Sequence, residues 1–203
     1  IENKMTGMGV FTYETFRRIA ASHLEHTFYF IFDRPYSENF ITSENIIPIV
    51  VKPKVKHHPF FLHYWYEYAL PKQLKKIQAD LFISPDGFMS LKTSVPSLIV
   101  IHDINFEHYP HFLPRAISQY YRTFTPKYAK KAKHILTVSE FSKQDIQTQY
   151  GITPNKIDVV YNGANNIYKP IDTATQIEYR KAHTESCPFF LFIGILNQRK
   201  NIV

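Results

Sequence analysis

His102 and Asp103 directly follow an apolar run, residues 97–101, whose composition is that of a buried strand. A histidine at the end of such a strand can hydrogen-bond a sugar hydroxyl or stabilise positive charge through its backbone carbonyl, and a neighbouring carboxylate can orient the ring. The alternative is that Asp103 starts a turn and that His102 is a rim residue without a chemical role. We treat both as candidate catalytic residues.

Gly7 and Gly9 open an expected first helix, in the sequence Thr-Gly-Met-Gly that starts at Thr6. Glycines at a helix N-terminus let a ligand approach backbone N–H groups at the positive end of the helix dipole. This pattern favours contact with a phosphate group. It is incomplete as a dinucleotide-binding fingerprint, because Thr12 stands where a third glycine is expected. The alternative is an ordinary tight turn that contains two glycines.

Two further candidate groups follow later apolar runs. Ser139 can cap the helix that comes after it, face a cleft, or do both. Gly194 ends the last apolar run, and Arg199 and Lys200 come shortly afterwards. A guanidinium and an ammonium group beyond a strand-end glycine can neutralise a diphosphate. Adjacent basic residues on a solvated surface are the alternative.

These candidates require strands that end at one edge of a sheet. Most of the apolar runs are about five residues long and lack alternation, which is typical of strands buried on both faces of a parallel sheet. Amphipathic stretches separate the runs, so the sequence predicts an α/β fold with a Rossmann-like, doubly wound, mostly parallel sheet. Ligands bind such sheets beyond the carboxyl ends of the strands. The runs are residues 26–32, 46–51, 80–83, 97–101, 134–138, 157–161 and 189–193.

The sequence also predicts the helices between these strands. An apolar stripe predicts a helix over residues 114–133, and the internal Pro126 is expected to kink or split it. Another helix is predicted over residues 139–151. The expected first helix, residues 8–22, follows residues 1–5, which are too few and too polar to form a strand. We therefore expect that the first strand of the sheet is missing from this sequence.

Composition limits the class of protein. The chain has 203 residues, 44% of them apolar, and a formal net charge of +7. This is sufficient for a globular core, and the charge favours anionic partners such as a nucleotide diphosphate, nucleic acid or an acidic lipid surface. A single cysteine, Cys187, excludes an intramolecular disulfide and a cysteine-based zinc cluster, which fits a reducing compartment.

Membrane association is expected to be peripheral. No run approaches the roughly 18 apolar residues that span a bilayer, and the N-terminus lacks the pattern of a signal peptide. We expect a cytoplasmic protein that can contact the inner face of a membrane. Residues 52–66 mix cationic and aromatic side chains and can lie at a membrane interface or form a loop that enters a packed helix. We favour the packed helix from Trp65 onward and take residues 52–61 as the candidate for contact with a membrane or an acceptor.

In order and content these motifs resemble glycosyltransferase family 4, the group of retaining GT-B enzymes that includes many mannosyl- and glucosyltransferases of bacterial polysaccharide synthesis. The resemblance extends over nearly all of the chain. Its most specific parts are the sequence TVSEFS at residues 137–142 and the terminal glycine followed by RKN. The matching segments are TGMGVFTYE (6–14), WYEYALP (65–71), ADLFISP (79–85), IHD (101–103), LTVSEFSK (136–143), VVYNG (159–163), FIG (192–194) and RKN (199–201).

The resemblance implies two Rossmann-like lobes. Residues 1–161 would form the N-terminal acceptor domain, residues 162–188 the interdomain connection, and residues 189–203 the first strand and phosphate loop of a donor domain. The complete enzyme would transfer a hexose from a nucleotide diphosphate sugar to a glycan or lipid-linked acceptor with retention of configuration. It would use no metal and no cofactor, and the fragment alone is expected to be inactive because one wall of its cleft is absent.

The resemblance also implies a role for each candidate residue. One departure is Ile195, where many family members carry arginine, so the phosphate role rests mainly on Lys200. The implied roles are catalytic for His102 and Asp103, donor-binding for Gly7, Gly9, Ser139, Gly194, Arg199 and Lys200, and acceptor-binding for Met8 and Asp86.

Three other functions are compatible with parts of the pattern. A nucleotide-sugar epimerase or phosphorylase can share the fold without being a transferase. A nicotinamide-dependent dehydrogenase could use Gly7, Gly9 and Asp33, although the third glycine is missing. A basic nucleic-acid-binding module is the non-enzymatic alternative, but the sequence has no stacking motif or basic helix, so we expect no nucleic-acid partner.

Overall fold

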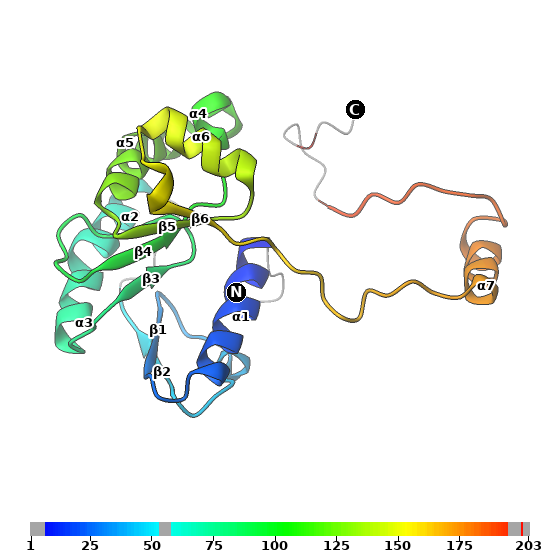
Figure 1. The fold of residues 1–203 in the computed structure, drawn as a ribbon, viewed down its shortest axis with the longest axis horizontal. Helices are drawn as coiled ribbons and strands as arrows, with labels where there is room; N and C mark the ends of the chain where they lie inside the picture. The colour runs from blue at the N-terminus through cyan, green and yellow to red at the C-terminus, as the bar shows by residue number, and fades with distance from the viewer. Residues whose placement is uncertain (1–6, 53–57, 195–199, 201–203) are drawn as a thin grey trace. The chain divides into compact units, whose positions relative to one another are not determined.

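The chain divides into two units, Ile1–Tyr161 and Asn162–Val203. The computed structural model describes residues 7–52, 58–194 and 200 (Figure 1). Arg199 and Ile195 therefore lie outside the described residues, as does Thr6. The predicted α/β fold is confirmed in the unit Ile1–Tyr161, where parallel strands alternate with helices.

Six of the seven apolar runs form strands in this unit, as predicted. All of the described pairings are parallel, within a two-stranded sheet of order β1-β2 and a four-stranded sheet of order β3-β4-β5-β6. The strands are β1 (Phe28–Phe32), β2 (Ile46–Val50), β3 (Phe82–Ser84), β4 (Ser97–Val100), β5 (His134–Thr137) and β6 (Ile157–Val159).

Parallel pairing brings the carboxyl ends of the strands to one edge. Val100 of β4 lies opposite Leu136 of β5, and Leu136 lies opposite Asp158 of β6. Just past the strands the ladder continues, because the N–H of Ile101 donates to Leu136 at 2.9 Å. The residues that follow β3, β4 and β5 therefore emerge side by side.

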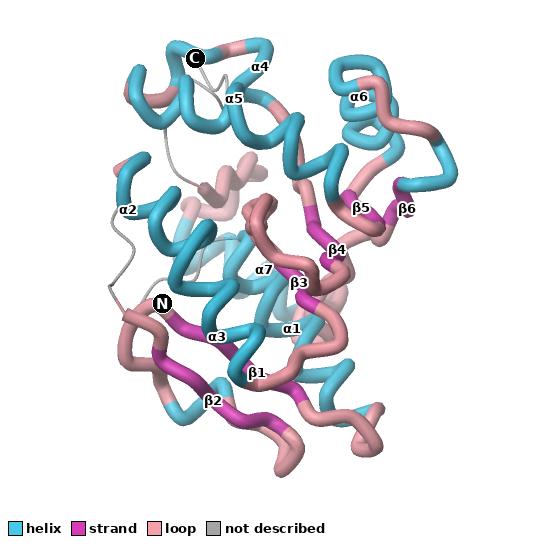
Figure 2. Tube along the Cα trace, turned by 90° about the vertical axis from the view of Figure 1, so that its left-hand side faces the viewer, coloured by secondary structure: helices cyan, strands magenta, loops and turns pink. Residues whose placement is uncertain are grey.

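Helices cover both sides of the strands. In Figures 1 and 2, α1 lies on one side of β1 and α3 on the other, as a doubly wound fold requires. Helices α2 and α3 are joined by the π-helical turn Trp65–Ala69, so residues 59–76 are helical without interruption. The helices of this unit are α1 (Gly7–Ser22), α2 (Pro59–Tyr64), α3 (Leu70–Lys76), α4 (Asn105–His108), α5 (Arg115–Lys131) and α6 (Glu140–Tyr150).

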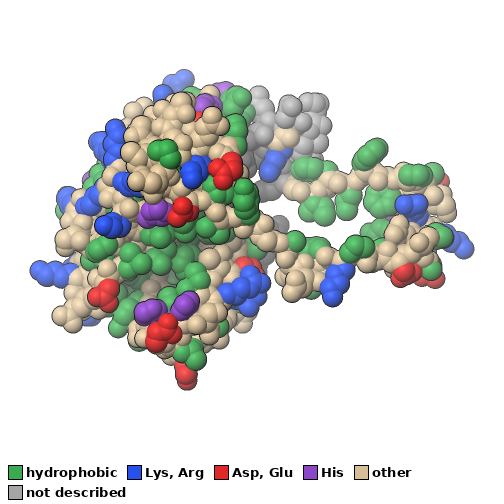
Figure 3. All heavy atoms as spheres, viewed as in Figure 1, with side chains coloured by type: hydrophobic (Ala, Val, Ile, Leu, Met, Phe, Trp, Pro, Cys, Tyr) green, Lys and Arg blue, Asp and Glu red, His purple; other side chains and the backbone are tan. Residues whose placement is uncertain are grey.

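Among the strands that the structure describes, those of one sheet form no ladder with those of the other. Figures 1 and 2 place β1 on the side of its sheet that is nearer to β3, yet these two strands belong to different sheets. One hydrophobic cluster connects them, because Ile31 and Phe82 both pack against its buried residues, among them Leu70 and Leu74. Figure 3 shows hydrophobic side chains gathered in a hollow over the region of β1 and β3.

Helix α5 runs through Pro126 and is not split there, so of the two expected effects, a kink or a split, the split does not occur. A proline inside a helix costs about 3 kcal/mol or more, since it removes one hydrogen bond and crowds the preceding turn. Tyr120 precedes Pro126 and Tyr128 and Ala129 follow it, and all three are buried. Burial of a large side chain contributes roughly 1.5–3 kcal/mol, so packing on both sides of the proline outweighs the local penalty.

Helix α6 begins and ends as its sequence predicts. Ser139 has extended backbone and accepts a hydrogen bond from the N–H of Ser142 at 3.1 Å, which makes it the N-cap. Gly151 ends the helix in the left-handed conformation, with φ of 65°, and its N–H donates to Gln147 at 2.9 Å.

The unit Asn162–Val203 contains helix α7, Thr173–His183, with Asp172 as its N-cap. The buried strand expected over residues 189–193 does not form, and that expectation was wrong for this structure. Phe190 is fully exposed and Ile193 is 84% exposed. A strand of a parallel sheet needs a hydrogen-bonded neighbour, and no strand of the described part of this unit offers one. Cys187, expected beside that strand, is also exposed.

Candidate functional site

The predicted site residues of the unit Ile1–Tyr161 come from one edge of the four-stranded sheet and from the start of α1. Asp86 follows β3, His102 and Asp103 follow β4, and Ser139 follows β5. Because these strands are neighbours and parallel, the structure brings the three segments together. Helix α1 joins them through Phe11, whose ring lies edge-on to the imidazole of His102 with the ring centres 4.9 Å apart.

His102 is half-buried and is fixed at two points. Its Nε2 lies 3.0 Å from the carbonyl oxygen of Pro85, in the loop after β3. A carbonyl can only accept, so in the neutral ring Nε2 carries the proton and Nδ1 is left as an acceptor. The ring of Phe11 packs edge-on against the same imidazole. The arrangement can therefore present Nδ1 to a hydroxyl donor.

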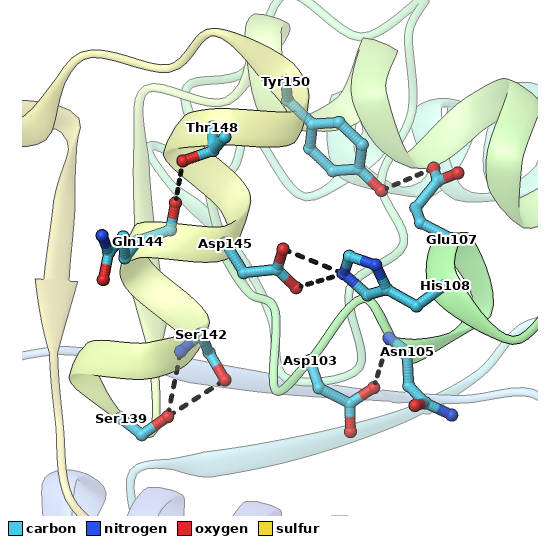
Figure 4. A network of polar contacts seen from close by, with 10 residues as sticks. All are labelled: Asp103, Asn105, Glu107, His108, Ser139, Ser142, Gln144, Asp145, Thr148 and Tyr150. Atoms are coloured by element: carbon cyan, nitrogen blue, oxygen red, sulfur yellow. Dashed lines mark hydrogen bonds and ion pairs between the residues drawn. The ribbon is translucent and has the colours of Figure 1, made fainter.

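Asp103 does not orient His102, contrary to one of the two interpretations of the sequence. Its Oδ1 accepts a hydrogen bond from the N–H of Asn105 at 3.0 Å (Figure 4). A short aspartate side chain bonds readily to the backbone two residues further on. Asp103 is exposed, and this turn starts α4. The orientation of the imidazole comes from Pro85 and Phe11 instead.

Asp86 belongs to a polar cluster at the end of β3. Its carboxylate accepts a hydrogen bond from Ser84 Oγ at 2.8 Å and from the hydroxyl of Tyr66 at 3.1 and 3.3 Å. Tyr66 and Ser84 are buried, whereas the Asp86 residue is exposed. The cluster also fixes the loop that supplies the Pro85 carbonyl to His102.

The surroundings of Asp86 change its protonation. Protein packed closely around the carboxylate raises the pKa of Asp86, and the hydrogen bonds from Ser84 and Tyr66 oppose part of that shift. Burial and the nearby carboxylate raise the pKa of Tyr66 well above its usual value, so its hydroxyl stays a donor.

Gly7, Met8 and Gly9 form the first turn of α1, as predicted. The Met8 side chain is exposed, with 51% of its surface accessible. A Cβ added to Gly7 would meet no atom within 4 Å. Packing within the described residues therefore does not require glycine at position 7, and the space beside its backbone is open to a ligand.

Ser139 is engaged in capping. Besides accepting from the N–H of Ser142, its hydroxyl donates to Ser142 Oγ at 3.0 Å. Figure 4 shows both contacts on the first turn of α6. The structural role expected for this serine is thus confirmed, and its contact with a donor stays a prediction.

A polar network fastens α4 to α5 and α6. His108 Nε2 lies 2.9 Å from both carboxylate oxygens of Asp145, and the two side chains point toward each other in Figure 4. Glu107 accepts from Arg122 at 3.1 Å and from the hydroxyl of Tyr150 at 3.0 Å. Burial and the Glu107 carboxylate raise the pKa of Tyr150 above its usual value.

Glu67 is a buried carboxylate that the sequence did not single out. It is 3% exposed and accepts hydrogen bonds from the N–H of Leu91 at 2.9 and 3.1 Å. Lys131 donates to the carbonyls of Leu91 and Thr93 in the same loop. These contacts fix the loop before β4. The available signal was an acidic residue inside an apolar helical stripe, at residues 65–71.

The remaining donor-binding candidates belong to the unit Asn162–Val203. Gly194 and Lys200 are exposed, and Arg199 lies outside the described residues. A Cβ on Gly194 would come within 2.8 Å of the Phe192 ring, the far end of a flexible side chain. Their contact with a diphosphate stays a prediction.

Other features of the described residues bear on ligand classes. Within residues 7–52, 58–194 and 200, no group of three or more His, Cys, Asp or Glu side chains is arranged to hold a metal ion. None of the described helices combines the length and apolar character needed to cross a bilayer. A shallow pocket of about 460 Å³ at the start of α5 contains none of the predicted site residues and is lined by Pro110, His111, Leu113, Arg115, Ser118, Gln119 and Arg122.

Comparison with known proteins places these motifs in a family. Residues 5–166 match the family model described as Glycosyltransferase Family 4. The chain is also 36% identical over 67 residues to the O-antigen chain mannosyltransferase RfbU of Salmonella typhimurium, a match that covers 33% of this chain and 18% of that protein. The family match covers most of the chain and all of the strands described above. The chain therefore belongs to glycosyltransferase family 4.

Proposed function

We propose that the protein containing this chain is a retaining hexosyltransferase of cell-surface polysaccharide synthesis. It moves a sugar from a nucleotide diphosphate donor to a glycan or a lipid-linked acceptor. Family membership and the similarity to an O-antigen chain mannosyltransferase support this assignment. The observation that carries the site is the imidazole of His102, fixed by Pro85 and Phe11 at the sheet edge.

In this proposal His102 positions the transferred sugar. With its proton on Nε2, the ring offers Nδ1 to a sugar hydroxyl. A neutral hydrogen bond of this kind contributes about 1 kcal/mol, and more when the unpaired partner would be left desolvated. Because Pro85 and Phe11 hold the ring, little side-chain entropy is lost when the sugar binds.

The departing diphosphate carries most of the negative charge that develops during transfer. The N-terminal turn of α1, with Gly7 at its first position, supplies the positive end of a helix dipole. Arg199 and Lys200 are the proposed cationic partners on the donor side. Fixed cations and N–H dipoles aimed at such charge can supply several kcal/mol.

The acceptor is proposed to approach Met8 and Asp86. Asp86 is an exposed residue whose carboxylate is held by Tyr66 and Ser84, and the Met8 side chain is exposed. A carboxylate can accept a hydrogen bond from an acceptor hydroxyl, while a thioether packs against an apolar group. We place this reaction in the cytoplasm, at the inner face of a membrane when the acceptor is lipid-linked.

The test is sugar transfer by the full-length protein. Radiolabelled nucleotide sugars are incubated with and without lipid-linked and glycan acceptors, and the anomeric configuration of the product is determined by NMR. His102→Ala and Lys200→Ala should each lower the transfer rate, by roughly tenfold or more for the loss of a group that contacts the reacting substrate. His26→Ala, at an exposed histidine in the loop before β1, is the matched control.

Three results would contradict the proposal. Unchanged rates in both variants would remove the assigned roles. Donor turnover that is independent of any acceptor would indicate an epimerase or a phosphorylase. An inverted product would exclude retention.

A further inference from the structure

The outer side of the helical stretch 59–76 carries exposed aromatic rings at every fourth position. Phe60 is 65% exposed, Tyr64 is 43% exposed and Tyr68 is 52% exposed. The rings of Tyr64 and Tyr68 are stacked, with their centres 5.8 Å apart and their planes 19° from parallel. The ammonium of Lys92 lies 3.6 Å from the centre of the Tyr68 ring.

These rings are not needed for the core. The same stretch buries Leu62, Trp65 and Tyr66 on its inner side, with each side chain no more than 7% exposed. Trp65 also donates its indole N–H to the carbonyl of Val51 at 3.1 Å. The inner side alone therefore explains why the helix packs on the domain. A row of three large exposed aromatic side chains has no comparable explanation and marks an interaction surface.

The exposed charges of the helical stretch itself have one sign. Along residues 59–76 the only acidic residue is Glu67, which is buried and bonded to Leu91, whereas Lys72, Lys75 and Lys76 are all exposed. Lys72 continues the four-residue spacing of the rings. We call Phe60, Tyr64 and Tyr68 with Lys72, Lys75 and Lys76 the aromatic–lysine face.

We propose that the aromatic–lysine face binds the surface of an anionic phospholipid bilayer. Aromatic rings lie at the level of the lipid headgroups, and lysines beside them are attracted to anionic lipids. Exposed aromatic rings can also bind a neutral sugar by stacking. The exposed charged groups of this stretch are cations and none is a carboxylate, so the charge complementarity favours lipid phosphates over uncharged sugar hydroxyls.

This inference deepens the proposed function, because it identifies the surface that would bring the enzyme to a lipid-linked acceptor. The two can fail separately. Binding to vesicles is measured without donor or acceptor, so a protein that binds lipid but transfers no sugar leaves the aromatic–lysine face intact. Conversely, a protein that transfers sugar but does not bind anionic vesicles overturns only this inference.

The experiment measures co-sedimentation of the full chain with vesicles of phosphatidylcholine alone and with 30% phosphatidylglycerol, a fraction chosen to give a strongly anionic surface. Wild type should bind only the anionic vesicles, and less at high salt. The variant Lys72→Gln/Lys75→Gln/Lys76→Gln should lose about 100-fold in partition coefficient at low salt, at roughly fivefold per lysine. Phe60→Ser/Tyr64→Ser/Tyr68→Ser should lose at least about tenfold.

Two matched controls separate the face from general properties of the chain. Lys133→Gln/Lys169→Gln/Lys181→Gln removes the same charge from exposed lysines elsewhere, and Phe141→Ser removes an aromatic side chain that is 78% exposed on α6. Both should bind vesicles as the wild type does. Circular dichroism and the fluorescence of the single tryptophan, Trp65, confirm that each variant is folded.

Insertion of the rings is tested with Phe60→Trp in vesicles that contain brominated lipid. Quenching of the added fluorescence supports insertion, with the wild type correcting for buried Trp65. The proposal is overturned when the ring variant binds anionic vesicles like the wild type, or when the control lysine variant loses as much binding as the variant of the face. If the ring variant loses binding to a neutral oligosaccharide but binds anionic vesicles like the wild type, the aromatic–lysine face is a sugar-binding surface. This result would also overturn the proposal.

Discussion

The imidazole of His102 receives its orientation from groups that lie far from it in the sequence. Pro85 comes from the loop after β3 and Phe11 from the first helix. The carbonyl of Pro85 fixes which nitrogen carries the proton, and thereby decides which nitrogen can receive a hydroxyl. At this scale the orientation of the imidazole depends on one hydrogen bond of 3.0 Å and one ring contact.

The first prediction separates the two nitrogens of His102. In His102→Gln the amide nitrogen can replace Nε2 and keep the bond to Pro85, while no acceptor remains near Nδ1. In His102→Asn the shorter amide reaches the position of Nδ1 instead. We expect kcat/KM to fall roughly five- to tenfold more in the Gln variant than in the Asn variant. Steady-state transfer kinetics check this, and equal losses would contradict the assigned proton position.

The second prediction concerns Asp86 and pH. Its pKa is raised in the folded state, so the stability contributed by this group is fully present below its unfolded pKa and is lost as pH rises through the folded pKa. Asp86→Asn keeps an acceptor for Ser84 and Tyr66 but cannot ionise. The variant should therefore gain stability relative to wild type as pH rises from acid to neutral. Urea unfolding at several pH values measures the difference, and a constant difference would contradict the shift.

Elements in this fold begin and end where a few local groups satisfy backbone hydrogen bonds. Ser139 and Asp172 cap α6 and α7 with a side-chain oxygen, and Ser37 caps the short 3-10 helix Glu38–Phe40 in the same way. Gly151 ends α6 in the left-handed conformation. Helix α6 is further tied to α4 by the pair of His108 and Asp145. The orientation of the strand ends is thus fixed by caps and by contacts between helices.

The cap of α6 gives the third prediction. Ser139→Ala removes the acceptor for the N–H of Ser142 and should lower the free energy of unfolding by about 1 kcal/mol. Ser139→Asp restores an acceptor and should recover most of this loss. Chemical denaturation measures both variants. Equal stability of the wild type and the alanine variant would show that the cap is not significant.

The first turn of α1 gives the fourth prediction. Gly7→Ala meets no atom within 4 Å, so the thermal midpoint should stay within about 2 °C of wild type or rise slightly, since alanine favours a helix. The added methyl group should nevertheless raise KM for the donor if its phosphates approach this turn. A variant with unchanged stability and unchanged KM would remove Gly7 from the donor site.

At the scale of the whole molecule, local signals predicted the elements better than the contacts between them. The uninterrupted apolar runs marked β1 to β6, and Ser139 with Gly151 marked the limits of α6, because propensity and capping act within a few residues. Pro126 does not split α5, because the burial of Tyr120 and Tyr128 also decides whether the helix continues. The run 189–193 does not form a strand, because a strand also needs a partner.

The candidate site was predicted in part. Alternation of strands and helices was enough to bring His102 and Ser139 to one edge. The partners of His102, by contrast, lie 17 residues away at Pro85 and in a helix at Phe11. Glu67 is similar, since its bond to Leu91 spans 24 positions. Such pairings depend on tertiary packing, which spacing in one sequence does not encode.

The separation of β1–β2 from β3–β6 has a consequence for how this domain behaves by itself. β1 and β3 are each at an edge of their sheets in the described structure, and both are apolar. Unprotected edges of this kind recruit extended polypeptide. Amide protons in β1 and β3 should therefore exchange with solvent faster than those of β4 and β5. An added extended peptide that pairs in parallel with both β1 and β3 would slow that exchange, because its hydrogen bonds would join the two sheets into one.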